Sequence, residues 1–362
     1  MENTDKQQIE TQPTKKRLEY IDALRGFTMT LVVISHVLLF SFNIESEHQY
    51  TNIIFGNMRM PLFFFICGFL SYRANLKWNL KTYKENLAKK LQIQIIPTLI
   101  LGSLYALLVM KTGLLEFITT HSKLGYWFTI SLLEMFIIYY TTSLIMQSIY
   151  KNKEIPAKVF NSTLIAVAFF VYCCIFLTNH PMTMGVCNTL SLYYTTKFYI
   201  FFTAGIIASK YKECFFNMLN KEKFIIAALL IFALCTVLIQ TSGNKLTEHI
   251  YRNTIAFAGI FFLICFFRKN ENVFKKTTTV GKVLQYIGTR TLDIYLLHYF
   301  FIPHLPQVGN FIKGADNFVV EFTIALIVSA LIIGFCLLVS NVLRTSSLLG
   351  HFLFGAKIDK NK

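Results

Sequence analysis

Apolar stretches of about twenty residues recur along the whole chain, and they limit its fold more than any other feature. The hydrocarbon core of a bilayer is about 30 Å thick, so a helix needs about 20 apolar residues to cross it. Only 15% of the 362 residues are charged, which is not the composition of a soluble domain, and we expect no second domain because no soluble segment is long enough to form one. The sequence therefore predicts an all-α polytopic bundle of about ten transmembrane spans. The predicted spans are residues 21–43, 53–72, 91–110, 124–149, 159–178, 190–209, 223–240, 250–267, 283–304 and 319–343.

The distribution of lysine and arginine predicts how these spans are oriented. Cytoplasmic loops of membrane proteins carry an excess of both residues. With the N-terminus inside, the inner segments hold 26 of the 35 lysines and arginines and the outer loops hold 4. We therefore expect cytoplasmic termini, with a polar tail over 1–18, a membrane-embedded domain over 19–345 and a second tail over 346–362. The net charge of +16 then reflects orientation in the lipid bilayer, and no nucleic-acid partner is expected.

The sequence contains none of the usual signs of a metal site or a tightly bound cofactor. Its eight cysteines are scattered, nearly all within predicted spans, without C-x-x-C pairs or histidines at ligand spacing. Glycine-rich phosphate loops are also missing. We therefore expect no metal and no permanently bound cofactor, and we interpret the cysteines as small packing residues.

The first predicted span carries three ionisable residues, Asp22, Arg25 and His36. Arg25 and His36 are eleven residues apart, which is about three helical turns, so their side chains lie on one face about 16 Å apart along the axis. Ionisable groups in lipid are costly and usually mark a functional site. This face of the first span is therefore the first candidate for a site.

The predicted topology assigns a depth to the other polar residues within the spans. Arg25, Lys89, Lys90 and Arg290 lie toward the inner side and form a cationic mouth. Deeper polar residues that we expect to face one cavity are His36, Arg59, Glu134, Lys197, Tyr295 and His298. Cations suit phosphate groups, and an imidazole suits proton transfer near neutral pH. The pattern favours an elongated donor with phosphates at one end and its reactive group near His36.

Four segments of the chain resemble sequence blocks of one enzyme family. The blocks are YIDALRGF at 20–27 with its Arg25-x10-His36 pattern, MRMPLFFFICGFL at 58–70, YWF at 126–128 and IGTRTLDIYLLH at 287–298. By these blocks, in this order, the chain is identified as a member of the acyltransferase 3 family of integral-membrane acyltransferases. It departs from the family pattern at Cys67, Thr129 and Thr291, where Ser, Leu and Ser are usual.

The resemblance implies a ten-helix O-acyltransferase that moves an acyl group, usually acetyl, from acyl-CoA to a hydroxyl of a carbohydrate or lipid-linked sugar. Acetyl-CoA would be a co-substrate. The compact build is similar to fucose 4-O-acetylase-like and exopolysaccharide O-acetyltransferase-like members, which implies a bacterial inner-membrane location and a carbohydrate or glycolipid acceptor. The chain is also expected to be able to form a homo-oligomer.

The pattern and the resemblance together assign roles to individual residues. His36 is expected to act as general base, or to take the acyl group itself. Arg25 is expected to hold donor phosphate or the oxyanion side of the site, with Lys89, Lys90 and Arg290 as further phosphate ligands. The expected supporting or substrate-binding residues are Asp22, Arg59, Glu134, Lys197, Tyr295 and His298.

Two other functions fit part of the same pattern. A transporter of a polysaccharide, a lipid-linked sugar or a small molecule would use the intramembrane His, Arg, Glu and Lys residues as a proton relay. A scaffold without activity is disfavoured, because charges kept in lipid are costly. Dependence on an acyl-CoA donor would distinguish the enzyme from the transporter.

Overall fold

The computed structural model describes residues 18–74, 76–151, 153–178, 180–240 and 243–356, and every regular element in these segments is a helix. Within these described segments, eight helices are able to cross a membrane by length and composition, as expected for a multi-pass membrane protein. They cover Glu19–Ser41, Tyr50–Ser71, Leu80–Val109, Trp127–Ile149, Ala157–Thr178, Glu222–Ile239, Thr247–Lys269 and Phe318–Leu343. The all-α membrane bundle predicted from the sequence is therefore confirmed.

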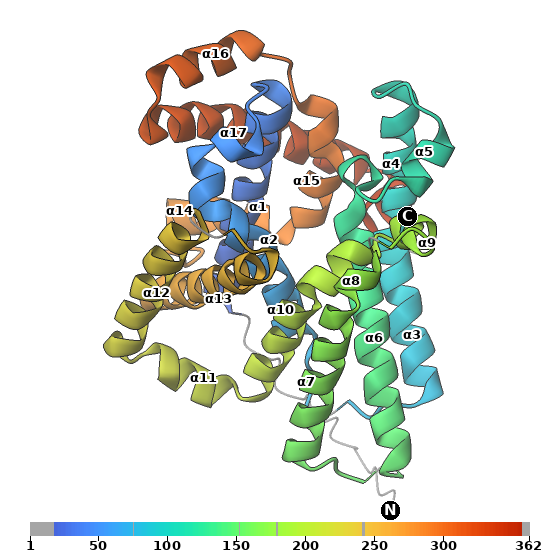
Figure 1. The fold of residues 1–362 in the computed structure, drawn as a ribbon. Helices are drawn as coiled ribbons and strands as arrows, with labels where there is room; N and C mark the ends of the chain where they lie inside the picture. Colours follow the sequence, from blue (N-terminus) through green and yellow to red (C-terminus); the bar gives the residue numbers. More distant parts are fainter. Residues whose placement is uncertain (1–17, 75, 152, 179, 241–242, 357–362) are drawn as a thin grey trace, which may run out of the picture.

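Figure 1 shows how the long helices are arranged, with α1 and α2 in the middle of the bundle. The long helices are α1 (Glu19–His36), α2 (Tyr50–Ser71), α3 (Leu80–Lys90), α4 (Ile96–Leu108), α6 (Trp127–Ile149), α7 (Ala157–Cys173), α10 (Leu192–Lys210), α12 (Glu222–Gln240), α13 (Lys245–Lys269) and α17 (Phe318–Leu343). The shorter helices are α5 (Leu114–Thr119), α8 (Ile175–Thr178), α9 (Met184–Thr189), α11 (Lys212–Leu219), α14 (Thr279–Thr289), α15 (Thr291–Leu297), α16 (Pro306–Ala315) and α18 (Ser347–Phe354). Short π-helices follow α1 (Val37–Ser41) and α3 (Leu91–Ile95), and 3-10 turns cover Ser46–His48, Lys123–Gly125 and His298–Phe301.

Two of the ten predicted spans differ from the rest. Residues 190–209 correspond to α10, which is 19 residues long but carries Lys197 among several tyrosines and threonines. Residues 283–304 are not one continuous helix, because α14 ends at Thr289 and α15 begins at Thr291. The break falls at Arg290, whose backbone (φ −112°, ψ 19°) is not helical, among glycine and threonine residues with low helix propensity. The count of ten spans and the cytoplasmic termini stay predictions.

Two close helix contacts position the central helices. A Cβ atom on Gly288 of α14 would lie 1.8 Å from the carbonyl oxygen of Asp22, and one on Gly26 of α1 would lie 2.0 Å from that of Leu284. Gly68 of α2 is equally tight against α10. Small residues at such contacts let helix backbones approach closely in a membrane. The α1–α14 contact brings Arg25 next to the broken segment at residue 290.

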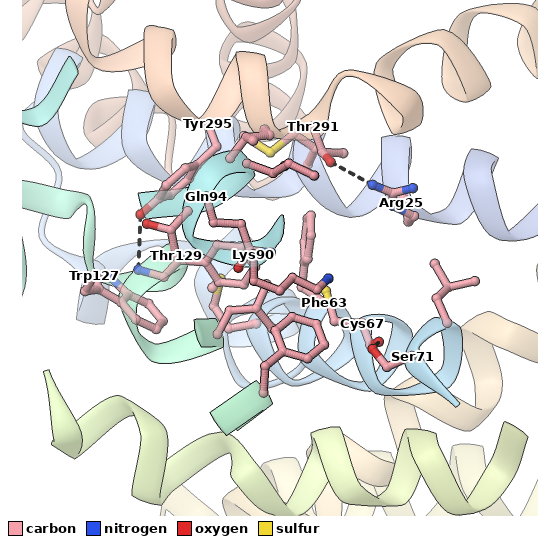
Figure 2. A pocket seen from close by; sticks show the side chains of 18 of the residues that line it. Arg25, Phe63, Cys67, Ser71, Lys90, Gln94, Trp127, Thr129, Thr291 and Tyr295 are labelled. Carbon is pink, nitrogen blue, oxygen red and sulfur yellow. Dashed lines mark hydrogen bonds between the residues drawn. The ribbon is translucent and has the colours of Figure 1, made fainter. Parts of the chain in front are cut away.

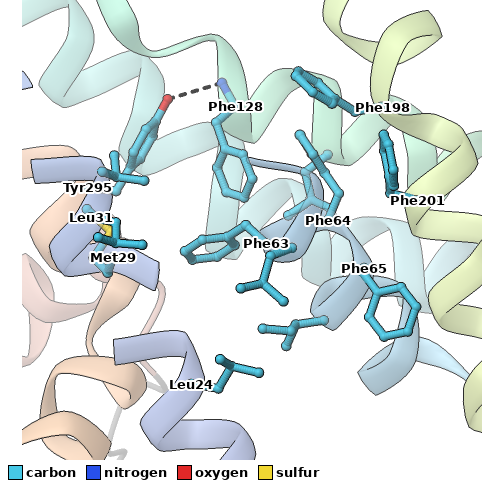
Figure 3. Close-up of a cluster of buried hydrophobic side chains, with 14 of the residues drawn as sticks. Leu24, Met29, Leu31, Phe63, Phe64, Phe65, Phe128, Phe198, Phe201 and Tyr295 are labelled. Carbon is cyan, nitrogen blue, oxygen red and sulfur yellow. Dashed lines mark hydrogen bonds between the residues drawn. The ribbon is translucent and has the colours of Figure 1, made fainter. Parts of the chain in front are cut away.

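An aromatic core lies beside the central helices (Figure 3). Phe64 stacks on Phe198 of α10 with ring centroids 5.3 Å apart, and Phe63 packs edge-on against Phe128 of α6 at 5.1 Å. Phe63, Phe64 and Phe65 are all buried, so this run of α2 faces protein and not lipid. The core joins α2, α6 and α10, which form part of the wall of the cavity described next.

Candidate active site

A cavity of about 640 Å³ lies between α1, α2, the continuous α3–α4 segment, α6, the start of α10 and α15 (Figure 2). Small-molecule sites usually have volumes of roughly 300–1,000 Å³, so the cavity has room for an organic ligand. The cavity-lining side chains include six of the residues singled out from the sequence: Arg25, His36, Arg59, Lys89, Lys90 and Tyr295. These residues come from four different helices, α1, α2, α3 and α15, and the fold brings them together.

One end of the cavity is cationic. Arg25, Arg73, Lys89 and Lys90 all line it, and Lys90 is within electrostatic reach of both arginines. The Arg25 guanidinium donates from Nη2 to Thr291 Oγ1 at 3.1 Å (Figure 2). Its Nη1 pairs with Asp22 Oδ1 at 3.4 Å. Charge-assisted bonds from such groups bind phosphate strongly where water is scarce. This end of the cavity therefore favours a polyanion.

The other end of the cavity holds His36 and Arg59. Helices α1 and α2 run antiparallel, so Arg59 of α2 comes near His36 while Cys67 of the same helix comes near Arg25. Arg59 Nη1 donates to Asn52 Oδ1 at 3.1 Å. An imidazole and a guanidinium thus lie at one end of the cavity, about 16 Å along α1 from the cationic end.

The His36 ring has defined partners on both nitrogens. Its Nδ1 lies 2.8 Å from Nε2 of His298, and the two rings are stacked with an interplanar angle of 10°. Its Nε2 lies 3.4 Å from the Tyr299 hydroxyl. Because both partners come from the segment after α15, that segment fixes the orientation of the ring.

Both ends of the cavity lie next to a π-helical turn. His36 directly precedes the π-helix Val37–Ser41, and Lys90 directly precedes the π-helix Leu91–Ile95. π-turns are rare and often occur at functional sites, because they change the direction of the side chains that follow. Ile93 and Gln94, within the second turn, line the cavity.

A left-handed turn before α6 supports the His36 end. Lys123, Leu124 and Gly125 have φ values of 50°, 51° and 104°, a strained conformation for the two non-glycine residues. The Gly125 carbonyl accepts hydrogen bonds from the Tyr295 hydroxyl at 2.9 Å and from the Tyr299 hydroxyl at 3.4 Å. The turn therefore holds the tyrosine that contacts His36.

The Lys123 side chain stabilises this turn through hydrogen bonds to neighbouring carbonyl groups. Its side chain is 2% exposed, and Nζ donates to the carbonyl oxygens of Ile118, Thr120 and Asn188 at 2.6–2.9 Å. Burial lowers the pKa of Lys123 to about 8, with the nearby Glu134 carboxylate opposing this effect. A buried amine whose three donors are all used acts as a fixed support for the two segments that it joins.

An aromatic wall lies beside the His36 end. Trp127 and Tyr194 both line the cavity, and their rings stack with centroids 3.8 Å apart. Phe198 extends the stack, with its ring centroid 5.9 Å from that of Trp127. The wall offers flat apolar ring surfaces next to polar groups, which suits an amphipathic ligand.

A family model described as an acyltransferase domain matches residues 18–341. The match covers α1 to most of α17 and includes every cavity-lining residue named above. The chain belongs to the acyltransferase 3 family. It is therefore a membrane acyltransferase, and the cavity is the candidate active site of this acyltransferase. Comparisons with curated proteins and with solved structures give no match.

Two further residues singled out from the sequence lie directly behind the lining of the acyltransferase cavity. Asp22 pairs with Arg25, and His298 contacts His36. Both are buried, with 6% and 0% of their surface exposed. They act on the cavity through Arg25 and His36, respectively.

The other three residues singled out from the sequence neither line the cavity nor lie directly behind its lining. Glu134 Oε2 accepts a hydrogen bond from Thr195 Oγ1 at 2.5 Å, so its partner is neither Arg59 nor Lys197. Lys197 Nζ lies 5.3 Å from the Phe198 ring centroid, toward α13. Arg290, expected at the phosphate-binding end, pairs instead with Asp293 at 3.2 Å.

Other cavity residues were not singled out from the sequence. Arg73 could have been found from the sequence, because it is the first cation after the second predicted span. Thr291 was noted only as a departure from the family pattern, and nothing in the sequence indicates its contact with Arg25. Trp127 lies in the YWF block at 126–128, but its stacking on Tyr194 depends on the tertiary fold and has no signal in the sequence. In the part of the chain that the structure describes, no cluster of three or more His, Cys, Asp or Glu residues would hold a metal ion.

Proposed function

We propose that this acyltransferase moves an acetyl group from acetyl-CoA to a hydroxyl of a cell-surface carbohydrate or lipid-linked sugar. One observation carries the proposal: a single cavity connects a four-cation end to His36. A coenzyme A thioester has phosphates at one end and its thioester at the other. Its phosphates would bind Arg25, Arg73, Lys89 and Lys90, and its thioester would extend toward His36.

His36 would act as the general base of a direct transfer. Its Nε2 would take the proton of the acceptor hydroxyl while the oxygen attacks the thioester carbonyl. The new C–O bond forms, the C–S bond breaks, and the proton on His36 then passes to the departing thiolate to give free CoA. Arg59, near His36, would stabilise the negative charge that develops on the carbonyl oxygen.

The aromatic wall supports a sugar as the acceptor. The faces of Trp127 and Tyr194 beside His36 present apolar surface to the C–H face of a sugar ring, while the sugar hydroxyls remain free to reach the base. We further propose a bacterial inner-membrane location with the cationic end toward the cytoplasm, where the donor is made. The excess of lysine and arginine on the segments predicted to face the cytoplasm supports this orientation.

A transfer assay with labelled donor tests the proposal. Purified protein is incubated with acetyl-labelled acetyl-CoA and an envelope glycan extract, and CoA release and glycan label are both measured. We expect His36→Gln to lower both rates by about 100-fold or more, because general-base catalysis contributes roughly 10²- to 10⁴-fold. His48→Gln, at an exposed loop histidine, serves as the matched control and should retain activity.

Two results would contradict the proposal. One is full transfer activity in the His36→Gln variant, which would show that His36 is not the general base. The other is an absence of donor binding and turnover by folded wild-type protein when extract is present. Movement of an unmodified substrate across proteoliposomes without any donor would then favour a transporter.

A further inference from the structure

We propose that His298 is a positioning residue that holds His36 in the tautomer protonated on Nδ1, so that Nε2 is the nitrogen that accepts the substrate proton. The inference deepens the proposed function and rests on the role of His36 in it. It assigns a specific task to a buried histidine that does not line the cavity.

The hydrogen bonds of His298 determine where its own proton lies. His298 Nδ1 is 3.0 Å from the carbonyl oxygen of Ile294. A carbonyl oxygen only accepts hydrogen bonds, so Nδ1 of His298 carries a proton and donates it. In the neutral ring, Nε2 of His298 is then a bare acceptor.

The same reasoning extends to His36. The bare Nε2 of His298 lies 2.8 Å from Nδ1 of His36, so Nδ1 of His36 carries the proton of that hydrogen bond. In neutral His36 the remaining nitrogen, Nε2, has a free lone pair. The hydrogen bond made by one ring nitrogen of a histidine commonly decides whether the other nitrogen carries hydrogen.

The geometry excludes His298 from contact with substrate. His298 is 0% exposed, and both of its nitrogens are occupied, one by Ile294 and one by His36. His36, in contrast, lines the cavity, and its Nε2 has only the long 3.4 Å contact with Tyr299. An acceptor hydroxyl can displace such a long contact.

The helix directly before His298, α15, is fixed on two sides. The Tyr126 hydroxyl donates to the Leu296 carbonyl at 2.9 Å, which ties α15 to the turn before α6. Asp293 of α15 accepts two hydrogen bonds from Arg344 at 2.8 and 2.9 Å, which ties it to the end of α17. A rigid support of this kind is what a tautomer-setting hydrogen bond requires.

The fixed tautomer has a direct chemical consequence. In the opposite tautomer, Nε2 of His36 would carry hydrogen and would be unable to accept a proton from the substrate. With the proton on Nδ1, uptake of the substrate proton at Nε2 gives an imidazolium whose Nδ1–H bond to His298 becomes charge-assisted and stronger. The hydrogen bond is thus stronger when the proton is transferred than in the resting enzyme, as catalysis requires.

A matched pair of substitutions at residue 298 separates this role from packing. His298→Gln offers an amide oxygen that can accept from Nδ1 of His36, whereas His298→Leu fills similar space without an acceptor. We expect His298→Leu to lower kcat by about 100-fold, with KM for acetyl-CoA within about threefold of wild type. His298→Gln should retain kcat within about tenfold of wild type. Leu297→Met, a volume-conserving change at a neighbouring buried residue, is the packing control.

A spectroscopic readout tests the tautomer itself. Protein labelled with ¹⁵N-histidine reports which ring nitrogen carries hydrogen, and the His36→Gln variant assigns the His36 signals. We expect hydrogen on Nδ1 of His36 in the wild type and in His298→Gln, and a mixture of tautomers in His298→Leu. Elution volume and melting temperature in detergent check that each variant is folded.

The outcomes distinguish this inference from the proposed function. Hydrogen on Nε2 of His36 in the wild type would overturn the inference, as would equal losses of kcat in His298→Gln and His298→Leu with an unchanged His36 tautomer. A wild-type protein without CoA release would refute the proposed function, while the spectra would still test the contact between the two histidines.

Discussion

At the scale of single residues, Arg25 depends on a partner from the other end of the chain. The hydroxyl of Thr291 accepts from its Nη2, while Asp22 on its own helix pairs with Nη1. These two contacts orient the planar guanidinium toward the cavity without using all five of its N–H donors. The remaining donors are available for a phosphate group.

We predict that Arg25→Lys weakens donor binding more than it slows chemistry. Lysine keeps the charge but lacks the planar fork that binds an oxyanion through two hydrogen bonds. KM for acetyl-CoA should rise by about tenfold, which corresponds to about 1.4 kcal/mol. Thr291→Val, which keeps Arg25 but removes its anchor, should show a smaller rise in KM. A large loss of kcat with unchanged KM in Arg25→Lys would instead place Arg25 at the reacting carbonyl.

Lys123 allows a prediction about stability. Lys123→Met removes the donor of three part-buried hydrogen bonds to carbonyl oxygens, and each such bond contributes about 0.5–1.5 kcal/mol to stability. We expect a clearly lower melting temperature in detergent than for Lys111→Met, a change at a solvent-exposed loop lysine. Equal melting temperatures for the two variants would show that the Lys123 contacts contribute little to stability.

The lowered pKa of Lys123 predicts the pH dependence of this contribution. Burial lowers that pKa to about 8 from the ordinary value of 10.5. Between these values the unfolded chain still holds the proton that the folded chain has released, so the contribution of Lys123 to stability rises with pH over this window. Thermal denaturation at pH 7.5 and pH 9.5 should show this rise in the wild type, and Lys123→Met should lack it.

At the scale of helices, the sequence predicts which residues form each helix better than it predicts which face of that helix is turned toward the cavity. Apolar length fixes where a helix crosses the membrane, so eight predicted spans correspond to long apolar helices. Rotation depends on packing: Thr129, Leu132 and Phe136 of α6 face the cavity, and Glu134 lies off that stripe and contacts α10. For the same reason, residues on the cavity side of α1 were predictable only where charges marked the face.

Breaks and changes of helix type were also beyond the sequence pattern. The long segment through α3 begins at Leu80, eleven residues before the predicted span, because a lysine-rich stretch continues the helix outside the apolar window. The break at Arg290 and the π-turns after His36 and Lys90 depend on tertiary contacts. Mean hydropathy is averaged over a window of many residues, so it does not detect a break or a π-turn that involves only a few of them.

The α1–α14 contact gives a prediction at this scale. Gly288→Ala places a Cβ atom 1.8 Å from the Asp22 carbonyl oxygen, so α14 must move away from α1 and carry Thr291 with it. We expect a lower melting temperature together with weaker acetyl-CoA binding. Gly334→Ala in α17 is the control, since nothing lies within 4 Å of its added Cβ atom, and it should leave both measurements near those of the wild type. Intact donor binding in a destabilised Gly288→Ala variant would separate this contact from the placement of Arg25.

At the scale of the whole molecule, the two ends of the cavity lie at opposite ends of α1, so the orientation of α1 in the membrane determines from which side the donor enters. The cationic end lies near the start of α1 and the end of α2, and the His36 end lies near the end of α1. If the N-terminus is cytoplasmic, the donor enters from the cytoplasm and the acyl group is presented toward the opposite leaflet. The orientation of the protein in the membrane therefore decides which pool of acceptor is modified.

We predict that this orientation can be measured at Cys67, which lines the cavity near Arg25 and Lys90. In a variant that retains Cys67 as its one cysteine, a membrane-impermeant maleimide should label inverted membrane vesicles and leave intact spheroplasts unlabelled. A second variant that keeps Cys214, an exposed cysteine on a segment predicted to face the cytoplasm, reports sidedness independently. Acetyl-CoA should slow labelling of Cys67 and not of Cys214, because only Cys67 lies in the cavity. Labelling of Cys67 from the outer face, or labelling that ignores acetyl-CoA, would contradict cytoplasmic entry of the donor through the cationic end.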